Sequence, residues 1–260
     1  MNVIRAGKFA LPLVFLVLAM GCAKEANQTQ PVTTKTDSGT STAAAAKDAK
    51  QRDQALVRVV NAVPGNQAFD VYTEDQKVFD SIAFKTVTPY QELSDKRHSF
   101  RLLPTGQDKA PLAVETGETL MPGEHYTIVV MPDTNDKLKL QVVKDNLVPP
   151  ATDKAEVRVI HASPDAGEVD VVAKQGNKKL FSGVDTGSDT KYTEVEPMTS
   201  ALEIRPEGKD NALVSLPNAK FDKGKLYTIV VAGRNNGMPK LQAVVIEDGI
   251  GTGATASVGD

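Results

Sequence analysis

The sequence predicts an all-β protein with two tandem antiparallel β-sandwich domains, immunoglobulin-like or transthyretin-like in topology, after a signal peptide and a disordered tether. Three observations predict this class. The second half of the chain repeats the first at an offset of about 100 residues, apolar and polar residues alternate within short segments, and turn residues recur about every ten residues. Antiparallel sheets that bury one face and expose the other have this pattern.

The N-terminal segment predicts an export signal that ends before the single cysteine of the chain. Two basic residues precede an apolar run at 9–20, which is too short to cross a bilayer as a helix and fits a removable signal peptide at 1–21. Residues 18–22 resemble a bacterial lipobox, in which the thiol of Cys22 receives a diacylglyceryl group. We expect lipidation at Cys22, because it accounts for a lone exposed thiol in an oxidising compartment. The alternative is a secreted protein with a free N-terminal thiol.

Composition divides the rest of the chain into five segments. Residues 22–54 contain mostly small and polar side chains, which cannot offset the entropy of ordering by packing, so we expect a disordered tether there. The repeats follow at 55–147 and 154–248, joined by a proline-containing linker at 148–153, and a flexible tail takes 249–260. Each repeat has the length of an independent domain.

The two repeats align without a gap over their first strand and turn. Residues 57–64 (VRVVNAVP) match residues 157–164 (VRVIHASP), and later landmarks follow with slips of one or two residues. These landmarks are Tyr90 with Tyr192, Pro104 with Pro206, 126–130 with 227–231, and Leu140 with Leu241. A period this long indicates tandem domains rather than a solenoid.

Within each repeat the hydrophobic period is two. Leu138, Leu140 and Val142 alternate with polar residues, which predicts a strand with one buried face. Turn signals such as 104–106 (PTG) and 121–123 (MPG) separate such segments, and we expect six to eight short strands in each repeat. Since the chain has no Trp and its one Cys lies near the N-terminus, the cores depend on Val, Leu, Ile, Tyr and Phe.

The second repeat carries the pattern of a bacterial envelope family. Residues 157–166 (VRVIHASPDA), 169–172 (VDVV) and 224–231 (GKLYTIVV) resemble the family catalogued as domain of unknown function 4397. The first repeat departs from this pattern at Asn61 and Gly65, where the second has His and Asp. The resemblance implies a tandem β-sandwich that is secreted or lipid-anchored, and it brings no activity with it.

One loop of the second repeat contains the residue types of a hydrolytic triad. His161, Ser163 and Asp165 lie within five residues, but alternation along a strand and the turn at Pro164 provide no oxyanion hole, and no nucleophile elbow is present. The first repeat also lacks the His and the Ser. We therefore expect no catalytic residue and place His161 at the edge of the core. An envelope hydrolase that uses this loop is the alternative.

The same turn holds carboxylates that raise a second alternative, a calcium-binding or small-ligand-binding module. Asp165, Glu168 and Asp170 offer oxygen ligands, but their spacing matches no regular calcium loop, and the three histidines are too far apart for a short zinc motif. We expect no metal ligand and no cofactor. Asp70 and Asp170 recur in both repeats, so we expect each carboxylate to accept hydrogen bonds from a turn or to pair with the first-strand arginine of its repeat.

Charge and composition exclude further classes. The chain carries 30 basic and 33 acidic residues, and the signal peptide removes two basic ones, which leaves a net charge of about −5 without a basic stripe. Binding to nucleic acid is therefore not expected. The glycines at 249–253 precede no helix and do not form a phosphate-binding loop. Aromatic residues are few, which disfavours a polysaccharide platform.

These observations together predict a lipid-anchored protein of the bacterial cell envelope that acts as a non-catalytic binding or structural module. Its partners would be the membrane, through the N-terminal lipid, and an envelope protein or polymer, bound through loops at the ends of the sandwiches. We expect a monomer. Ala23 stands where an inner-membrane retention signal has Asp, which favours the outer membrane if the source has two membranes.

Overall fold

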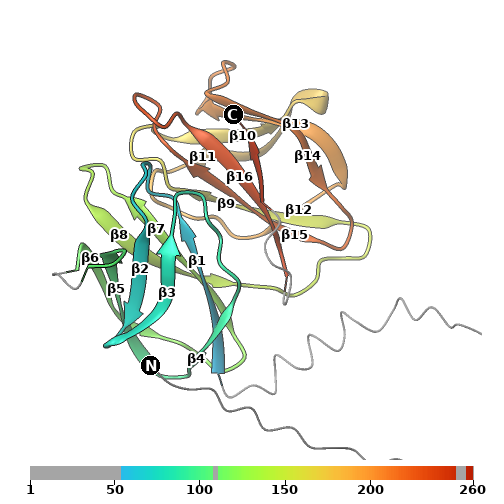
Figure 1. Cartoon of the computed structure of the whole chain (residues 1–260). Coiled ribbons are helices and arrows are strands. Elements are labelled where there is room, and N and C mark those ends of the chain that lie inside the picture. Colours follow the sequence, from blue (N-terminus) through green and yellow to red (C-terminus); the bar gives the residue numbers. More distant parts are fainter. Residues whose placement is uncertain (1–53, 108–110, 250–255, 260) are drawn as a thin grey trace, which may run out of the picture. The chain divides into compact units, whose positions relative to one another are not determined.

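A computed structural model describes residues 54–107, 111–249 and 256–259, and these residues form strands joined by turns and loops (Figure 1). Within them the single exception is a short 3₁₀ turn, η1 (Gln175–Asn177). The predicted all-β class is confirmed. The signal peptide, Cys22 and the predicted tether lie outside the described residues, except for Gln54, which begins the first strand.

The first repeat is a sandwich of two four-stranded sheets. The β1 sheet has the order β4-β1-β7-β8, and the β2 sheet has the order β3-β2-β5-β6. The strands are β1 (Gln54–Asn61), β2 (Phe69–Thr73), β3 (Gln76–Ile82), β4 (Gln91–Ser94), β5 (Arg97–Pro104), β6 (Ala113–Thr119), β7 (His125–Pro132) and β8 (Leu138–Asp145).

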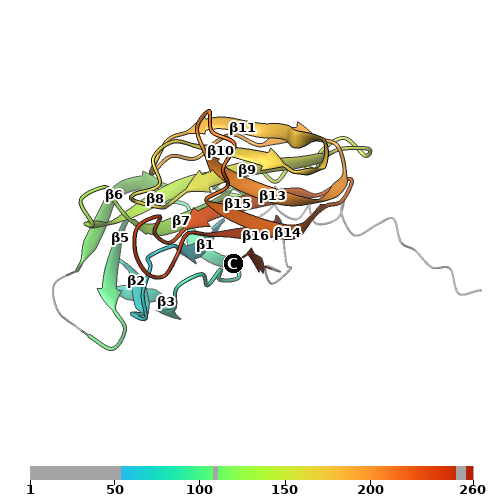
Figure 2. The same cartoon turned by 90° about the horizontal axis from the view of Figure 1, so that it is seen from above.

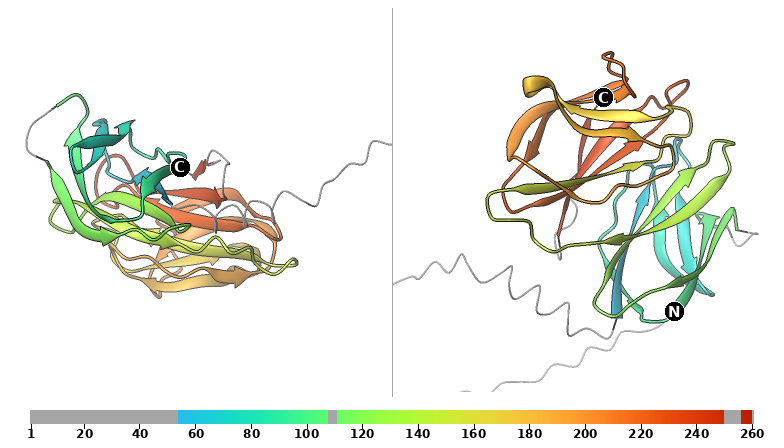
Figure 3. Two further views of the ribbon diagram at one scale, coloured as in Figure 1. Left: turned by 90° about the horizontal axis from the view of Figure 1, so that it is seen from below. Right: turned by 180° about the vertical axis from the view of Figure 1, so that it is seen from behind.

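The second repeat has the same strand order with one addition. The β9 sheet runs β12-β9-β15-β16-β17, and the β10 sheet runs β11-β10-β13-β14. The strands are β9 (Ala155–His161), β10 (Val169–Ala173), β11 (Lys178–Val184), β12 (Thr193–Val195), β13 (Met198–Pro206), β14 (Val214–Phe221), β15 (Leu226–Ala232), β16 (Gln242–Asp248) and β17 (Ala256–Gly259). Eight strands in matching order show that the sequence repeat is a repeat of the fold, as the separate strand sets in Figure 3 illustrate.

One strand pair in each repeat is parallel, which the antiparallel prediction did not include. β1 pairs with β7 in parallel, and β9 pairs with β15 in the same way. The five strands between each such pair pass through both sheets, so the chain returns to the first sheet in its original direction. All other pairs of neighbouring strands in the described residues are antiparallel.

The residues of β1 alternate between two different cores. Val57 and Val59 pack between the two sheets of the first repeat, whereas Val60 points to the opposite face and is 2% exposed. In the second repeat β9 behaves in the same way. The opposite faces of the β1 and β9 sheets meet in a third core, to which both repeats contribute; Figure 2 shows β7 and β8 next to β9 and β15. The two repeats therefore form one compact unit.

The C-terminal segment differs from the prediction of a flexible tail at 249–260. Residues 256–259 form β17, which pairs antiparallel with β16 over Ala243–Ile246. The physical reason is that β16 would otherwise be an edge strand with unpaired backbone groups, which a following segment can satisfy. The predicted tail is therefore wrong for these four residues.

Candidate functional site: a charged contact between the repeats

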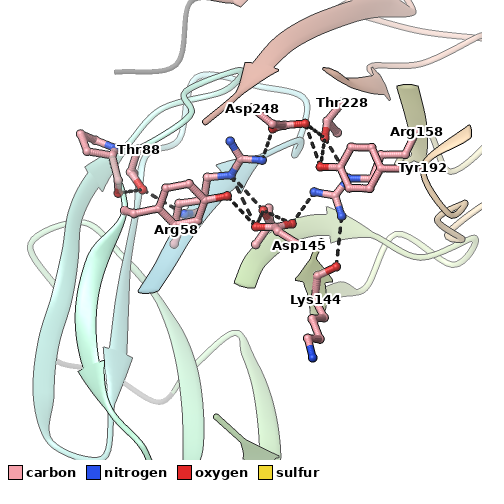
Figure 4. Close-up of polar contacts among 12 residues, drawn as sticks. Arg58, Thr88, Lys144, Asp145, Arg158, Tyr192, Thr228 and Asp248 are labelled. Atoms are coloured by element: carbon pink, nitrogen blue, oxygen red, sulfur yellow. Dashed lines mark hydrogen bonds and ion pairs between the residues drawn. The ribbon is translucent and has the colours of Figure 1, made fainter. Parts of the chain in front are cut away.

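Eight polar side chains lie inside the contact between the β1 and β9 sheets, and the two repeats supply them from matching positions. They are Arg58, Tyr90, Thr127 and Asp145 of the first repeat, and Arg158, Tyr192, Thr228 and Asp248 of the second. Figure 4 labels all of them except Tyr90 and Thr127. We call these eight residues the interface cluster. Each arginine lies at the middle of the first strand of its repeat, and each aspartate ends the eighth strand.

The two arginines pair with the aspartate of the other repeat. Arg58 Nη2 donates to Asp248 Oδ1 at 2.5 Å, and Arg158 Nη2 donates to Asp145 Oδ1. The contact is thus reciprocal, as in a two-fold dimer interface where residue i meets j and j meets i. Arg58 Nε also lies 4.0 Å from the aspartate of its own repeat, Asp145.

A threonine in each repeat links the arginine to the nearby carboxylate. Arg58 Nε donates to Thr127 Oγ1 at 2.9 Å, and Arg158 Nε donates to Thr228 Oγ1 at 2.8 Å. Each threonine hydroxyl then donates to the aspartate of its own repeat, at 2.7 Å to Asp145 and 2.6 Å to Asp248. A hydroxyl suits this place because it accepts and donates at once.

A tyrosine in each repeat completes the cluster. The hydroxyl of Tyr90 donates to Asp145 at 2.7 Å, and the hydroxyl of Tyr192 donates to Asp248 at 2.9 Å. Their rings lie against the arginines, with the guanidinium carbons of Arg58 and Arg158 at 4.9 and 4.7 Å from the ring centroids. The tyrosines therefore contribute both a donor to the carboxylate and a cation–π contact to the guanidinium.

Burial and charge together set the protonation states in the cluster. The side chains of Arg58 and Arg158 are 2% and 1% exposed. Burial by itself lowers the pKa of Arg58, but Tyr90, Asp248 and Asp145 raise it above its ordinary value. Burial likewise raises the pKa of Asp145, yet the two arginines outweigh burial and hold that pKa below 3.8. The cluster thus contains two guanidinium cations that face carboxylates.

Apolar side chains surround the cluster and exclude water from it. They include Val60, Val129 and Val143 of the first repeat and Ile160, Val230, Val244 and Ile246 of the second. Two polar contacts flank the interface: Lys139 Nζ donates to the carbonyl of Gly187 at 3.3 Å, and Gln141 Nε2 donates to Asp189 Oδ1 at 2.9 Å. In this dry setting each charge requires its partner, so the cluster fixes one relative placement of the repeats.

The predicted candidate loop of the second repeat is brought together, but not as a triad. His161 Nε2 donates to the carbonyl of Gly167 at 2.8 Å, and His161 Nδ1 accepts the backbone N–H of Ser163 at 3.4 Å. Both ring nitrogens of His161 therefore contact backbone groups, and the Ser163 hydroxyl donates to Asp165 at 3.3 Å. His161 is fully buried. It lies at the edge of the core of the second repeat, on the same strand face as Val157 and Val159, as the period of two predicts.

Asp165 fastens this loop to the β15–β16 hairpin. Its two carboxylate oxygens accept the backbone N–H groups of Asn235 and Asn236 at 2.8 and 2.9 Å. Although burial opposes ionisation, these donors hold the pKa of Asp165 below its ordinary value. The carboxylate thus contributes a structural contact between a loop and a hairpin.

Asp70 and Asp170 serve as turn acceptors, which was one of the two predicted roles. Asp70 accepts the backbone N–H of Ser81 at 2.9 Å and the Thr105 hydroxyl at 2.8 Å. Asp170 accepts the backbone N–H groups of Gly183 and Gly208, at 3.0 and 3.1 Å. The alternative, an ion pair with the first-strand arginine of the same repeat, is wrong, because Arg58 pairs with Asp248 and Arg158 pairs with Asp145.

Two further findings concern the described residues alone. In that part of the chain, no group of three or more His, Cys, Asp or Glu side chains is arranged to hold a metal ion. Over the same ranges, no helix has the length and apolar character needed to span a membrane.

Sequence reasoning missed the interface cluster, although a signal for it exists. Residues 126–131 (YTIVVM) and 227–232 (YTIVVA) are apolar on both faces of a strand, whereas a strand with one face in water alternates. Val60 and Ile160 likewise put apolar side chains on the face that was expected to meet water. A second buried face on matching strands of both repeats indicates that the repeats cover one another.

Comparison with known proteins finds a resemblance to one family and no activity. The model of the family described as Domain of unknown function (DUF4397) matches residues 55–172, which span the whole first repeat together with β9 and most of β10. A search of curated proteins finds no match. The matched range contains both arginines and one aspartate of the interface cluster, as well as the His161 loop. Over residues 55–172 the chain thus resembles this family of domains of unknown function, as its sequence pattern predicts.

Proposed function

We propose that this protein is a lipid-anchored protein of the bacterial cell envelope, in which the two repeats act as one rigid, non-catalytic binding or structural module. The observation that carries the proposal is the interface cluster. Its two reciprocal ion pairs join repeats that the proline-containing linker at 148–153 would not by itself hold against one another. A rigid pair presents the loops of both sandwiches in a constant arrangement, which suits the recognition of an envelope protein or polymer.

The anchoring part of the proposal depends on the sequence. The lipobox-like residues 18–22 and the lone Cys22 favour lipidation, and the polar segment that follows favours a spacer between the membrane and the first strand. The outer membrane is the favoured destination in a source with two membranes. Nucleic acid is not among the proposed partners because the chain has excess acidic charge.

The contacts of His161 and Asp165, the side chains best suited to catalysis in the candidate loop, support a non-catalytic role. Both nitrogens of His161 contact backbone groups, and Asp165 binds the hairpin at Asn235 and Asn236. A general base needs a free nitrogen directed at its nucleophile, and His161 has no such nitrogen in this geometry. If Ser163 were nevertheless an activated nucleophile, a fluorophosphonate probe would label it, and the proposal predicts no labelling.

The experiment that tests anchoring is intact mass and membrane fractionation of the wild type beside Cys22→Ser, expressed in a bacterium. We expect a diacylglyceryl mass and membrane association for the wild type, with both lost in Cys22→Ser. Ser41→Ala, in the same polar segment, is the matched control and should behave as the wild type. An unmodified wild type in the soluble fraction would contradict the anchoring proposal.

A further inference from the structure

A cavity of about 380 Å³ lies at one end of the first repeat. Its lining comes from the β1–β2 loop, including Val63 and Gly65, from the β7–β8 hairpin, including Leu138, and from Arg234 of the second repeat. Phe69, which is 1% exposed, also lines it. This volume is at the small end of the range for ligand sites, about 300–1,000 Å³, and is adequate for a dipeptide.

In the second repeat a carboxylate joins the corresponding loop and hairpin. There Asp165 joins the β9–β10 loop to the β15–β16 hairpin through the N–H groups of Asn235 and Asn236. In the first repeat the aligned residue is Gly65, which has no side chain to make this contact. A Cβ atom placed on Gly65 would meet nothing within 4 Å, so the space beside it is open.

The hairpin of the first repeat closes on itself instead. Asp133 accepts the backbone N–H groups of Asn135 and Lys137, at 2.8 and 2.9 Å. These two donors are therefore already bonded within the hairpin and do not serve a ligand in the cavity. The cationic group at the cavity is the guanidinium of Arg234, which donates to Asp136 Oδ1 at 2.6 Å and is 28% exposed. Asp136 is 60% exposed. A pair this exposed is weak, and a guanidinium has five N–H donors, so a second carboxylate can share or replace Asp136.

We propose that this cavity binds the free carboxylate end of a short aliphatic peptide. The carboxylate would pair with Arg234, and an aliphatic side chain would contact Leu138 and Val63, which are half-buried. The ligand would thus place a carboxylate beside the loop in which the first repeat has Gly65 and the second has Asp165, bound by a side chain rather than by hairpin N–H groups. This inference rests on the proposed binding role and names the class of ligand for it.

The test is isothermal titration of the soluble Cys22→Ser chain with N-acetyl-Ala-Leu, beside the same dipeptide with its C-terminus amidated. We expect the free acid to bind and the amide to bind at least roughly tenfold more weakly, as expected for loss of a charged hydrogen bond. Equal affinity for the two probes, or no binding of the free acid at millimolar concentration, would overturn the proposal.

Two variants with opposite expected effects make the test independent of folding. Arg234→Gln should weaken binding of the free acid by roughly tenfold or more. Asp136→Asn should strengthen it, because a competing and repelling carboxylate is removed, and Asn tolerates the positive φ of 61° at this position. Lys209→Gln removes a positive charge outside the cavity and is the matched control. Unchanged affinity in both Arg234→Gln and Asp136→Asn would contradict the proposal.

Failure here is distinguishable from failure of the proposed function. None of the cavity residues takes part in lipidation, so a membrane-bound wild type whose cavity ignores both probes would refute the cavity site alone. A soluble, unlipidated wild type that binds the free acid would refute the anchor and leave the site in place.

Discussion

Replacing Arg58 by Met removes one of two cations from the interface cluster and leaves two carboxylates with one guanidinium. Asp248 loses its 2.5 Å partner and keeps the hydroxyls of Thr228 and Tyr192 as donors. Breaking a buried ion pair by removing one partner costs about 3–5 kcal/mol of unfolding free energy. Because two neutral donors remain on Asp248, we expect Arg58→Met to cost about 3 kcal/mol, at the low end of that range.

The assay is urea unfolding followed by far-ultraviolet circular dichroism, since the chain has no Trp to report by fluorescence. Arg101→Met is the matched control. Arg101 pairs with Asp75 outside the interface, and their side chains are 32% and 103% exposed. An exposed pair contributes about 0–1 kcal/mol, so the control should be nearly neutral.

A double-mutant cycle isolates the contact between the repeats. Adding Asp248→Asn to Arg58→Met restores equal numbers of cations and carboxylates, so the double variant should lose less free energy than the two single variants together. We expect a coupling free energy of at least about 1.5 kcal/mol, as for other close charge pairs. Two results would contradict the predicted ion pair between the repeats. One is that the costs of the two single variants sum to the cost of the double variant within about 0.5 kcal/mol, and the other is that Arg58→Met costs no more than Arg101→Met.

Three further predictions concern single side chains. Asp170→Asn should cost about 2 kcal/mol near neutral pH, because the carboxylate accepts two backbone N–H groups. Burial raises the pKa of Asp170, but Lys179 and the two backbone donors outweigh burial and hold that pKa below 3.8. The stability is therefore present above that pH and is lost as the pH falls below it, which urea unfolding at acid pH checks. For His161, burial lowers the pKa below 6.5, so the stability of its neutral ring is present above that pH and is lost on acidification. Thermal melts between about pH 7 and pH 5 should show a shallower loss for His161→Asn, the side chain of the first repeat, than for the wild type, and parallel profiles would contradict this. Tyr192→Phe should cost about 1 kcal/mol through its lost hydrogen bond to Asp248, whereas Tyr72→Phe, outside the interface, should be neutral in the same urea assay.

The fold was predictable because its signals are local and repeated. Alternation at Leu138, Leu140 and Val142 and the turn at 121–123 each constrain a few neighbouring residues. The turn glycines confirm this logic, since Gly123 and Gly224 lie at matching positions with φ of 74° and 73°, which glycine adopts without strain. The parallel pairing of β1 with β7 was not predictable in this way, because it depends on the path of the chain through both sheets.

The interface cluster was harder to predict because its partners are distant in the sequence. Arg58 and Asp248 are 190 residues apart, and no spacing rule relates them. Tyr90 and Tyr192 align between the repeats, but the sequence does not show that their hydroxyls meet Asp145 and Asp248; both rings are half-buried at the contact between the repeats. Which charge an arginine meets depends on how two sheets dock, and only the apolar second face of β7 and β15 indicates that docking occurs.

The role of the His161 loop was also beyond the sequence pattern. His161, Ser163 and Asp165 do lie together, as their spacing requires, but the partners that define their roles are backbone groups of Gly167, Asn235 and Asn236. Every residue except proline has both a backbone N–H and a carbonyl group, so residue types alone do not indicate which backbone groups bind these side chains. Gly65 in place of Asp is the sequence difference that removes the carboxylate contact from this loop of the first repeat.

Differential scanning calorimetry of the soluble Cys22→Ser chain tests most directly whether the two repeats are one unit. If the interface cluster locks them together, both repeats unfold in a single reversible transition, and the calorimetric enthalpy equals the van't Hoff enthalpy. For a rigid module we expect a ratio of the two enthalpies close to one. Two resolved transitions, or a ratio near two, would show that the repeats unfold independently and would contradict the rigid module.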